Sequence, residues 1–206
     1  GILQAQSQCP LMAFIDYRLG ARNNLRTVED GLQQTNQGTL IHEILEHFWL
    51  EFKNQSKLFT LSDDELQEAL KKHISERFEG LSNAFDEHYL NLEQARIFEL
   101  LCQWMALEKQ RSAFSVVDTE QEKQIVLAGI EFTVVVDRID MVEGQKVILD
   151  YKTGKATVNN LLSTPIKAPQ LAVYLFTNDD AVSGLGYGLL HSDDGVKISA
   201  VVEDET

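Results

Sequence analysis

Two aspartates and a lysine in the second half of the chain have the residue types and spacing for chemistry. Asp137 follows three valines, Asp150 follows a Val-Ile-Leu run, and Lys152 stands two positions beyond Asp150. A carboxylate at the end of an apolar strand is costly unless another group pairs with it. Alternate residues of a strand face the same side, so Lys152 and Asp150 are expected to point toward the same place. We therefore treat these three residues as one candidate site.

The chemistry that this combination suits is phosphodiester hydrolysis. Two neighbouring carboxylates repel each other, and a divalent cation relieves that repulsion. Oxygen ligands favour Mg²⁺, Mn²⁺ or Ca²⁺ over zinc. Such a cation lowers the pKa of a bound water and polarises a phosphate, while a lysine offsets negative charge in the transition state. For each residue alone, a structural role at a strand end is the simpler interpretation.

The first half of the chain must supply helices. Apolar residues recur at steps of three and four over residues 39–53, which predicts an amphipathic helix. Three helices and a loop complete this half: a short helix over 9–20, a loop over 21–37, a helix from a Ser62–Glu65 capping box to Phe78, and a helix capped by Asn91 that ends near Arg111.

Beyond residue 112 the sequence becomes rich in Val and Ile, and Phe114, Val116 and Val117 open a region that is typical of strands. Residues 124–142 are expected to form a hairpin that turns at Gly129, followed by a strand over 146–152. The other expected elements are a helix over 169–177 and two strands joined by a turn at 193–195. This order predicts an α/β core after a helical lobe.

Four short motifs resemble the PD-(D/E)XK nuclease superfamily, and more specifically the RecB-type nuclease domains attached to bacterial recombination and repair helicases. They are Gly38-x-x-x-His42, Val134-x-x-Asp137-Arg138-x-Asp140, Asp150-Tyr151-Lys152-Thr153-Gly154 and Gln170-Leu171-x-x-Tyr174. The resemblance spans about residues 9–190. It implies a restriction-endonuclease-like core, in which helices flank a mixed central sheet, with an N-terminal helical lobe.

The resemblance also implies roles for single residues. The metal ligands would be three side chains and one main-chain carbonyl: those of His42, Asp137 and Asp150 and the carbonyl of Tyr151. Lys152 would be the catalytic lysine, and Gln170 and Tyr174 would position the lysine or the DNA strand. The cofactor would be Mg²⁺ or Mn²⁺, and hydrolysis of DNA would leave a 5′-phosphate and a 3′-hydroxyl.

The expected function is an exonuclease module in DNA repair or recombination, which acts on single-stranded DNA or an unwound end. A helicase-like region in the same chain or in a partner subunit would deliver that strand. One departure from the family pattern bears on access of the DNA: Val134 stands where a glycine is usual. Two alternatives stay open, since fold-level analogy does not fix a substrate. One is a catalytically weak or inactive module that binds DNA or a helicase partner, and the other is a nuclease for RNA or a structured junction.

The two cysteines bear on compartment and cofactor. Cys9 and Cys102 are too few for a disulfide scaffold and fit a reducing, cytoplasmic compartment. Many relatives hold an iron–sulfur cluster, and Cys9 resembles its first ligand. Because no three-cysteine run follows, we expect no cluster in this chain, with Cys9 an orphan ligand.

The chain has 206 residues, with 32 acidic residues against 18 Lys and Arg and a net charge of −14. We expect one domain over residues 1–206, with the helical lobe over 1–112 and the core over 113–206, as a piece of a longer protein, because the chain begins with Gly. No stretch reaches about 18 apolar residues, so no membrane span is expected.

The negative charge argues against nucleic acid if it is spread evenly, because Lys and Arg drive phosphate binding. It is not spread evenly: residues 137–175 hold four acidic and five basic residues, whereas residues 43–99 hold 13 and 6. We therefore expect weak DNA binding by this chain without a metal.

A few other residues have expected places. Arg138 is expected in a structural ion pair with Asp140 or another acid. Trp49 and Trp104 are expected in the core, and His47 and His73 at the surface.

Overall fold

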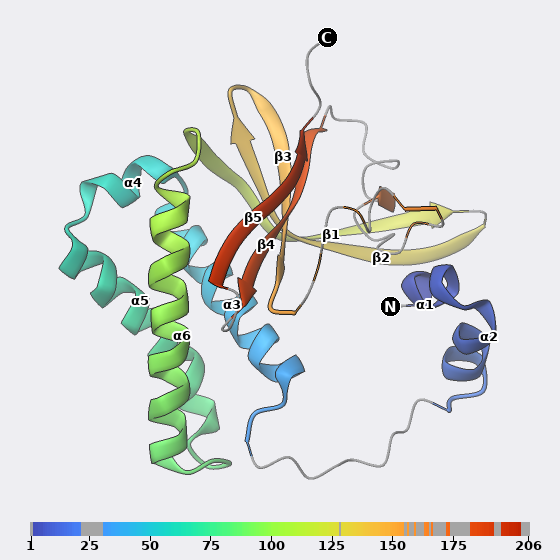
Figure 1. Cartoon of the computed structure of the whole chain (residues 1–206), viewed down its shortest axis with the longest axis horizontal. Coiled ribbons are helices and arrows are strands. Elements are labelled where there is room, and N and C mark those ends of the chain that lie inside the picture. Colours follow the sequence, from blue (N-terminus) through green and yellow to red (C-terminus); the bar gives the residue numbers. More distant parts are fainter. Residues whose placement is uncertain are drawn as a thin grey trace.

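The computed structural model describes residues 2–21, 31–127, 129–154, 182–191 and 195–202, together with isolated positions between 156 and 173. Helices precede strands along the chain, and α3, α5 and α6 gather on one side of the sheet (Figure 1). Helices α1 and α2 lie apart from α5 and α6 in the same view.

A mixed five-stranded sheet forms the centre of the molecule. Its strands are β1 (Phe114–Leu127), β2 (Ile130–Val142), β3 (Gln145–Lys152), β4 (Val182–His191) and β5 (Gly195–Val202), in that spatial order. The pair β3–β4 is parallel and every other neighbouring pair is antiparallel. A parallel pair requires a crossover, and the helix expected over residues 169–177 falls in that segment, almost entirely outside the described residues.

The hairpin predicted around Gly129 is confirmed, and it is longer than predicted. Its first strand begins at Phe114, where the strand-like region was expected to open, and continues without a break into the hairpin predicted from residue 124. Glu143 and Gly144 form the next turn, and both have positive φ, at 50° and 82°. Two left-handed central residues form the type I′ turn, whose twist matches that of a two-residue hairpin.

The helical half contains six α-helices in its described residues. They are α1 (Ile2–Gln8), α2 (Pro10–Ala13), α3 (Gln34–Phe52), α4 (Gln55–Thr60), α5 (Asp63–Phe78) and α6 (Glu87–Glu108). The helix predicted over 9–20 is α2 followed by one turn of π-helix, Phe14–Arg18. Helices α1 and α4 were not predicted, and α3 begins five residues before the predicted start at residue 39.

Capping explains where α5 and α6 begin. The predicted capping box of α5 is confirmed, because the Glu65 amide donates to the Ser62 hydroxyl at 3.2 Å and the Ser62 amide donates to the Glu65 carboxylate at 2.8 Å. The predicted cap of α6 is wrong. Asp86 caps it instead, accepting from the amides of His88 and Tyr89, so that Asn91 lies inside the helix. Aspartate and asparagine are comparable caps, and nothing in composition ranks one above the other here.

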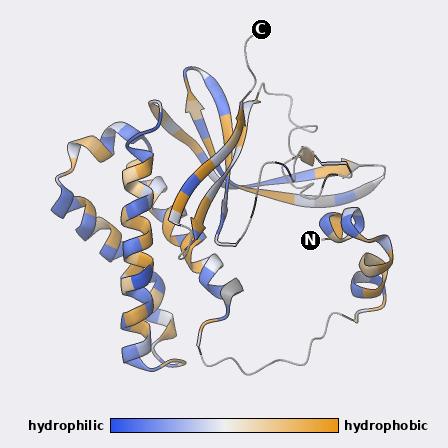
Figure 2. Ribbon diagram, in the orientation of Figure 1, coloured by the Kyte–Doolittle hydropathy of each residue, from blue (hydrophilic) through white to orange (hydrophobic). Residues whose placement is uncertain are grey.

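Two apolar clusters hold the layers together. The larger one joins α3, α5 and α6 to one face of the sheet, and it includes Trp49 and Trp104, both fully buried as predicted. The smaller one lies among the strands and includes Val136, Ile148 and Tyr187. Figure 2 shows the hydrophobic residues of the helices and strands interleaved with hydrophilic ones, as expected for elements with one buried face.

One surface prediction is wrong. His73 is 5% exposed: its ring packs edge-on against Phe48, with Nε2 3.2 Å from a Glu51 carboxylate oxygen. Its position on α5 between the buried Leu70 and Ile74 explains the burial. Among the described helices, none is long and apolar enough to cross a membrane.

Candidate active site

Strand register brings the predicted acids together. Strands β2 and β3 pair Arg138 with Leu149, so the next step of the same register sets Asp137 across from Asp150. On the other side of β3, Asp150 pairs with Tyr187 of β4. Cross-strand neighbours point to the same face of a sheet. The two aspartates therefore lie side by side, as the spacing of their motifs predicted.

Helix α3 carries His42 to this place. Its buried face, which includes Ile41, Ile44 and Leu45, seats the helix on the apolar core. The His42 ring then projects toward the sheet, with Nδ1 3.5 Å from Oδ2 of Asp137. Gly38, one turn earlier, lets the start of α3 approach the end of β3, because a Cβ there would meet the Thr153 hydroxyl at 3.2 Å. The Gly-x-x-x-His spacing thus has a local physical reason.

Asp137 joins the helix to both strands. Its side chain is buried, and its Oδ2 accepts a hydrogen bond of 2.6 Å from the amide of Tyr151. Burial alone would lower the pKa of His42, but the hydrogen bond and charge of Asp137 outweigh burial and hold that pKa above its ordinary value. In this arrangement Asp137 is held by a main-chain donor and faces a ring nitrogen.

Asp150 and Lys152 form the other half of the site. The Asp150 carboxylate is 2% exposed and forms an ion pair with the Lys152 ammonium, whose side chain is 40% exposed. Burial first, and then the charge of Asp137, raise the pKa of Asp150 to about 6, although Lys152 opposes the rise. Lys152 therefore reaches solvent from one side and a buried carboxylate from the other, where an incoming phosphate can meet it.

Glu120 is a residue of the candidate site that the sequence did not predict. Strands β1 and β2 pair Thr119 with Arg138 and Gln121 with Val136, so Glu120 stands across from Asp137. Its φ of 48° is left-handed, which costs a non-glycine residue of the order of 1–2 kcal/mol. Burial and the charge of Asp137 raise the pKa of Glu120 to about 7. Counting outward from the turn at Gly129 gives the same pairing, but the predicted strand began at residue 124 and stopped short of it.

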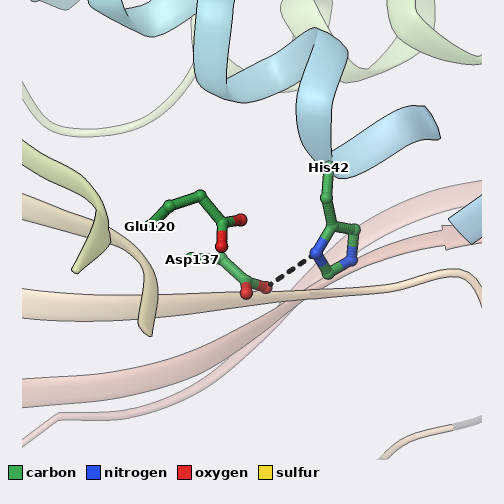
Figure 3. A group of neighbouring side chains, drawn as sticks. All are labelled: His42, Glu120 and Asp137. Carbon is green, nitrogen blue, oxygen red and sulfur yellow. Dashed lines mark ion pairs between the residues drawn. The ribbon is translucent and has the colours of Figure 1, made fainter. Parts of the chain in front are cut away.

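These side chains form a set of metal-ligand type. One donor atom each of His42, Glu120 and Asp137 lie within 4.8 Å of one another. Figure 3 shows the two carboxylates and the imidazole turned toward a common point, from β1, β2 and α3. A cation with bonds of about 2.0–2.6 Å fits between donor atoms at such separations. Two carboxylates and one imidazole nitrogen are suitable ligands for a divalent cation. The residues present therefore fit the metal ion that phosphodiester hydrolysis would need.

The comparisons with known proteins decide the family. The family model described as the PD-(D/E)XK nuclease superfamily matches residues 2–193. The chain belongs to the PD-(D/E)XK nuclease superfamily. Its mixed sheet flanked by helices is the restriction-endonuclease-like fold that the motifs implied, and membership implies a metal-dependent nuclease.

No curated protein matches the sequence. Among solved structures, the crystal structure of SSO0001 is similar over 94% of this chain and 77% of that chain, at 13% identity and with a TM-score of 0.27. A likeness at that score carries no argument about function.

Behind the PD-(D/E)XK site, a buried ion network fixes the strands. Arg138 donates to both carboxylate oxygens of Asp140 at 2.6 and 2.9 Å, as the predicted structural pair. It also donates to Glu108 of α6 at 2.6 Å and to the Tyr151 hydroxyl at 3.0 Å. Because Arg138 follows Asp137 and Tyr151 follows Asp150, this network holds the strand segments that carry the two aspartates.

Two predicted members of the site fall outside the part of the chain that the structure describes. They are Gln170 and Tyr174, although Ala172 and Val173 between them are described, and Val173 packs against the smaller core cluster. Cys9, the expected orphan ligand of a cluster, is exposed and unbridged near α2.

Proposed function

We propose that this chain is a divalent-metal-dependent deoxyribonuclease. The observation that carries the proposal is the meeting of two half-sites on adjacent strands: His42 with Asp137, and Asp150 with Lys152. A divalent cation held there would lower the pKa of a bound water and polarise the scissile phosphate. The donor set supports Mg²⁺ or Mn²⁺ as that cation.

The chain's own residues would do the rest. Asp137 and Asp150, with the Tyr151 carbonyl, would bind the cation, and His42 would add its ring nitrogen. Lys152 would place its ammonium against a non-bridging phosphate oxygen and offset the negative charge that develops there, and such stabilisation supplies much of the rate enhancement of many enzymes. The burial of both aspartates favours this electrostatic contribution, because charges interact more strongly where water is excluded.

More specifically, we propose that the chain is an exonuclease module of a DNA repair or recombination protein. A helicase-like region would supply it with single-stranded or unwound DNA. The products of the exonuclease would carry 5′-phosphates. The lysine and both metal carboxylates are present, which favours an active enzyme over a module that only binds DNA. Val134, in place of the usual glycine, is 3% exposed and fills the interior of the strand layer, so its side chain does not add bulk at the surface.

Cutting of labelled DNA tests this function. We expect the purified chain to degrade 5′-labelled single-stranded DNA in Mg²⁺ or Mn²⁺ and to stop when EDTA is added. An Asp150→Asn variant should be inactive, and ligation of the products should require no added 5′-phosphate. Single-stranded DNA left intact in both metals would refute the proposal, and equal cutting by the Asp150→Asn variant would assign the activity to a contaminant.

A further inference from the structure

Strands β4 and β5 extend the sheet beyond the candidate site, on the side of Asp150 (Figure 1). On β3, Tyr151 packs in the larger apolar cluster, so its neighbours Asp150 and Lys152 lie on the opposite face of the sheet. On β5, Ile198 packs against the same cluster, and its neighbour Lys197 therefore lies on the face of the site. Strand β5, at the edge of the sheet, thus adds a lysine to the face on which the reaction would occur.

The register of the strands places Lys197 in line with Lys152. Lys152 pairs with Leu189 of β4, and Leu189 in turn pairs with Lys197 of β5. Two strand spacings therefore separate the two lysines, which is about 10 Å between their backbones. Leu189 is 4% exposed and belongs to the smaller apolar cluster. The surface between the two lysines consequently has an apolar floor with a cation at each end.

The charges around Lys197 leave its ammonium group available for a phosphate. Residues 176–206 hold seven acidic residues, but none of the seven lies in β4 or β5. In the part of the chain that the structure describes, the exposed Lys197 forms no ion pair. On the other side of the site, β1 carries three acidic residues and one lysine. A polyanion therefore meets less repulsion over β4 and β5 than over β1.

We propose that Lys197 binds the backbone of the nucleic-acid substrate, at a phosphate next to the scissile one, so that the strand runs from the site over β4 and β5. The inference rests on the proposed nuclease function. Lys152 would act on the phosphate that reacts, whereas Lys197 would only hold the strand. Proteins that bind single strands use cations along the path of the backbone, and such phosphate contacts position a strand without reading its sequence.

Fluorescence anisotropy of a labelled single-stranded oligonucleotide in Ca²⁺ tests this contact. Lys197→Met removes the charge and keeps an apolar stem. Each phosphate contact on a single strand contributes about 0.7 to the slope of log K against log salt concentration, so the slope should decrease by about that amount. Affinity near physiological salt should fall about three- to fivefold.

Lys57→Met is the matched control, because it removes an exposed lysine from α4 and should bind DNA like the wild-type chain. A lysine on an edge strand can also serve to prevent pairing with another sheet. That role alone would leave the salt dependence of DNA binding unchanged. Equal slopes for the wild-type and Lys197→Met chains would therefore overturn the proposal.

Single-turnover cutting in Mn²⁺ separates binding of the strand from catalysis. Lys197→Met should need a higher protein concentration for its half-maximal rate, by the same factor as its loss of affinity, whereas Lys152→Met should lose rate at saturation. A Lys197→Met chain with an unchanged half-maximal concentration would contradict the proposal. The two proposals also fail separately. Binding that depends on Lys197 without any cutting would refute the nuclease function alone, and cutting by a chain whose DNA binding does not depend on Lys197 would refute this contact alone.

Discussion

At the scale of single residues, the site is a concentration of buried negative charge that one lysine only partly relieves. Asp150 and Glu120 both have pKa values above their ordinary range, at about 6 and about 7, and burial is the first cause of each. At neutral pH Asp150 is mostly ionised and Glu120 is about half ionised, and the ionised forms are unfavourable in the metal-free fold. A bound cation removes that cost, so metal binding and stability are expected to be linked.

The raised pKa of Glu120 predicts a pH-dependent stability. A carboxyl group with a higher pKa in the folded chain binds its proton more tightly when folded, so the stability it confers is lost as pH rises from about 4.5 to 7. In the metal-free chain, Glu120→Gln should therefore gain melting temperature over wild type at pH 8 and gain little at pH 5. Because Glu120 is half-buried, solvent screens the effect, and we expect at most about 1 kcal/mol or 2–4 °C.

Differential scanning calorimetry in EDTA at the two pH values measures this difference. Glu122→Gln serves as the control, since its exposed carboxylate should give no such pH dependence. If Glu120→Gln raises the melting temperature equally at pH 5 and pH 8, the Glu120 carboxyl group has the same pKa in the folded and unfolded chains, which would contradict this prediction.

Four of the residues that meet at this site were predicted from the sequence: His42, Asp137, Asp150 and Lys152. Glu120 was not. The first four belong to motifs with fixed spacing. Glu120 lies in a polar stretch, where no alternation of apolar residues marks a strand, and only the register counted from Gly129 points to it. Backbone strain at φ 48° is likewise invisible in a sequence.

At the scale of elements, the hairpin β1–β2 and strand β3 set the site, and α6 fixes them from behind. Arg138 connects Glu108 of α6 with Asp140 of β2 and the Tyr151 hydroxyl of β3, and its guanidinium stacks 4.2 Å from the centre of the Trp49 ring. The sequence predicted the hairpin, the strand that follows it and an ion pair for Arg138. The sequence could not predict that Arg138 also pairs with Glu108 of α6, because thirty positions separate the two residues along the chain.

Loss of Arg138 should lower the stability of the whole fold and not only remove a local contact. Arg138→Met leaves Glu108 and Asp140 buried with Arg111 as their shared cation, and breaking a buried pair costs about 3–5 kcal/mol. Urea unfolding followed by circular dichroism measures the loss. Arg96→Met is the matched control, because it removes a partly exposed pair with Glu93 within α6 and should cost about 0.5 kcal/mol. Equal losses in the two variants would contradict a structural role for the buried network.

The element boundaries that the sequence missed have local causes. Helix α6 begins after Asp86, and Asn91 further along the chain is an equally good cap by residue type, so the choice between them depends on packing. Helix α4 has six residues and is too short to show a periodicity. The capping box of α5 was predictable because both of its partners lie within four residues.

At the scale of the whole molecule, the charge of −14 and the nuclease site are compatible because the acids concentrate outside the motifs. The helical stretch 43–99 holds 13 acidic against 6 basic residues, and residues 176–206 hold 7 against 1. A strand of DNA approaching the molecule therefore meets repulsion from these two stretches and the least repulsion at the motif residues 137–175.

Binding of DNA should accordingly depend on a divalent cation. In EDTA at physiological salt, we expect a labelled single-stranded oligonucleotide to bind with a Kd weaker than about 1 µM, since few phosphates can be neutralised by Lys and Arg. Ca²⁺, bound by the same oxygen ligands, should tighten binding at least about tenfold. Fluorescence anisotropy measures both, and sub-micromolar binding in EDTA would contradict the repulsion inferred from the charge.

The proposed nuclease activity requires Asp137, Asp150 and Lys152 to act together on one phosphodiester bond, and Lys152 is the member that can be changed without removing a metal ligand. Its ammonium reaches solvent and pairs with Asp150, so Lys152→Met should leave the fold and the cation site in place. The measurement is the single-turnover rate of cutting of single-stranded DNA in saturating Mn²⁺ by wild-type and Lys152→Met chains. We predict a loss of about 10²–10³-fold, as for other donors that stabilise transition-state charge; a variant that cuts at the wild-type rate would contradict the proposed mechanism.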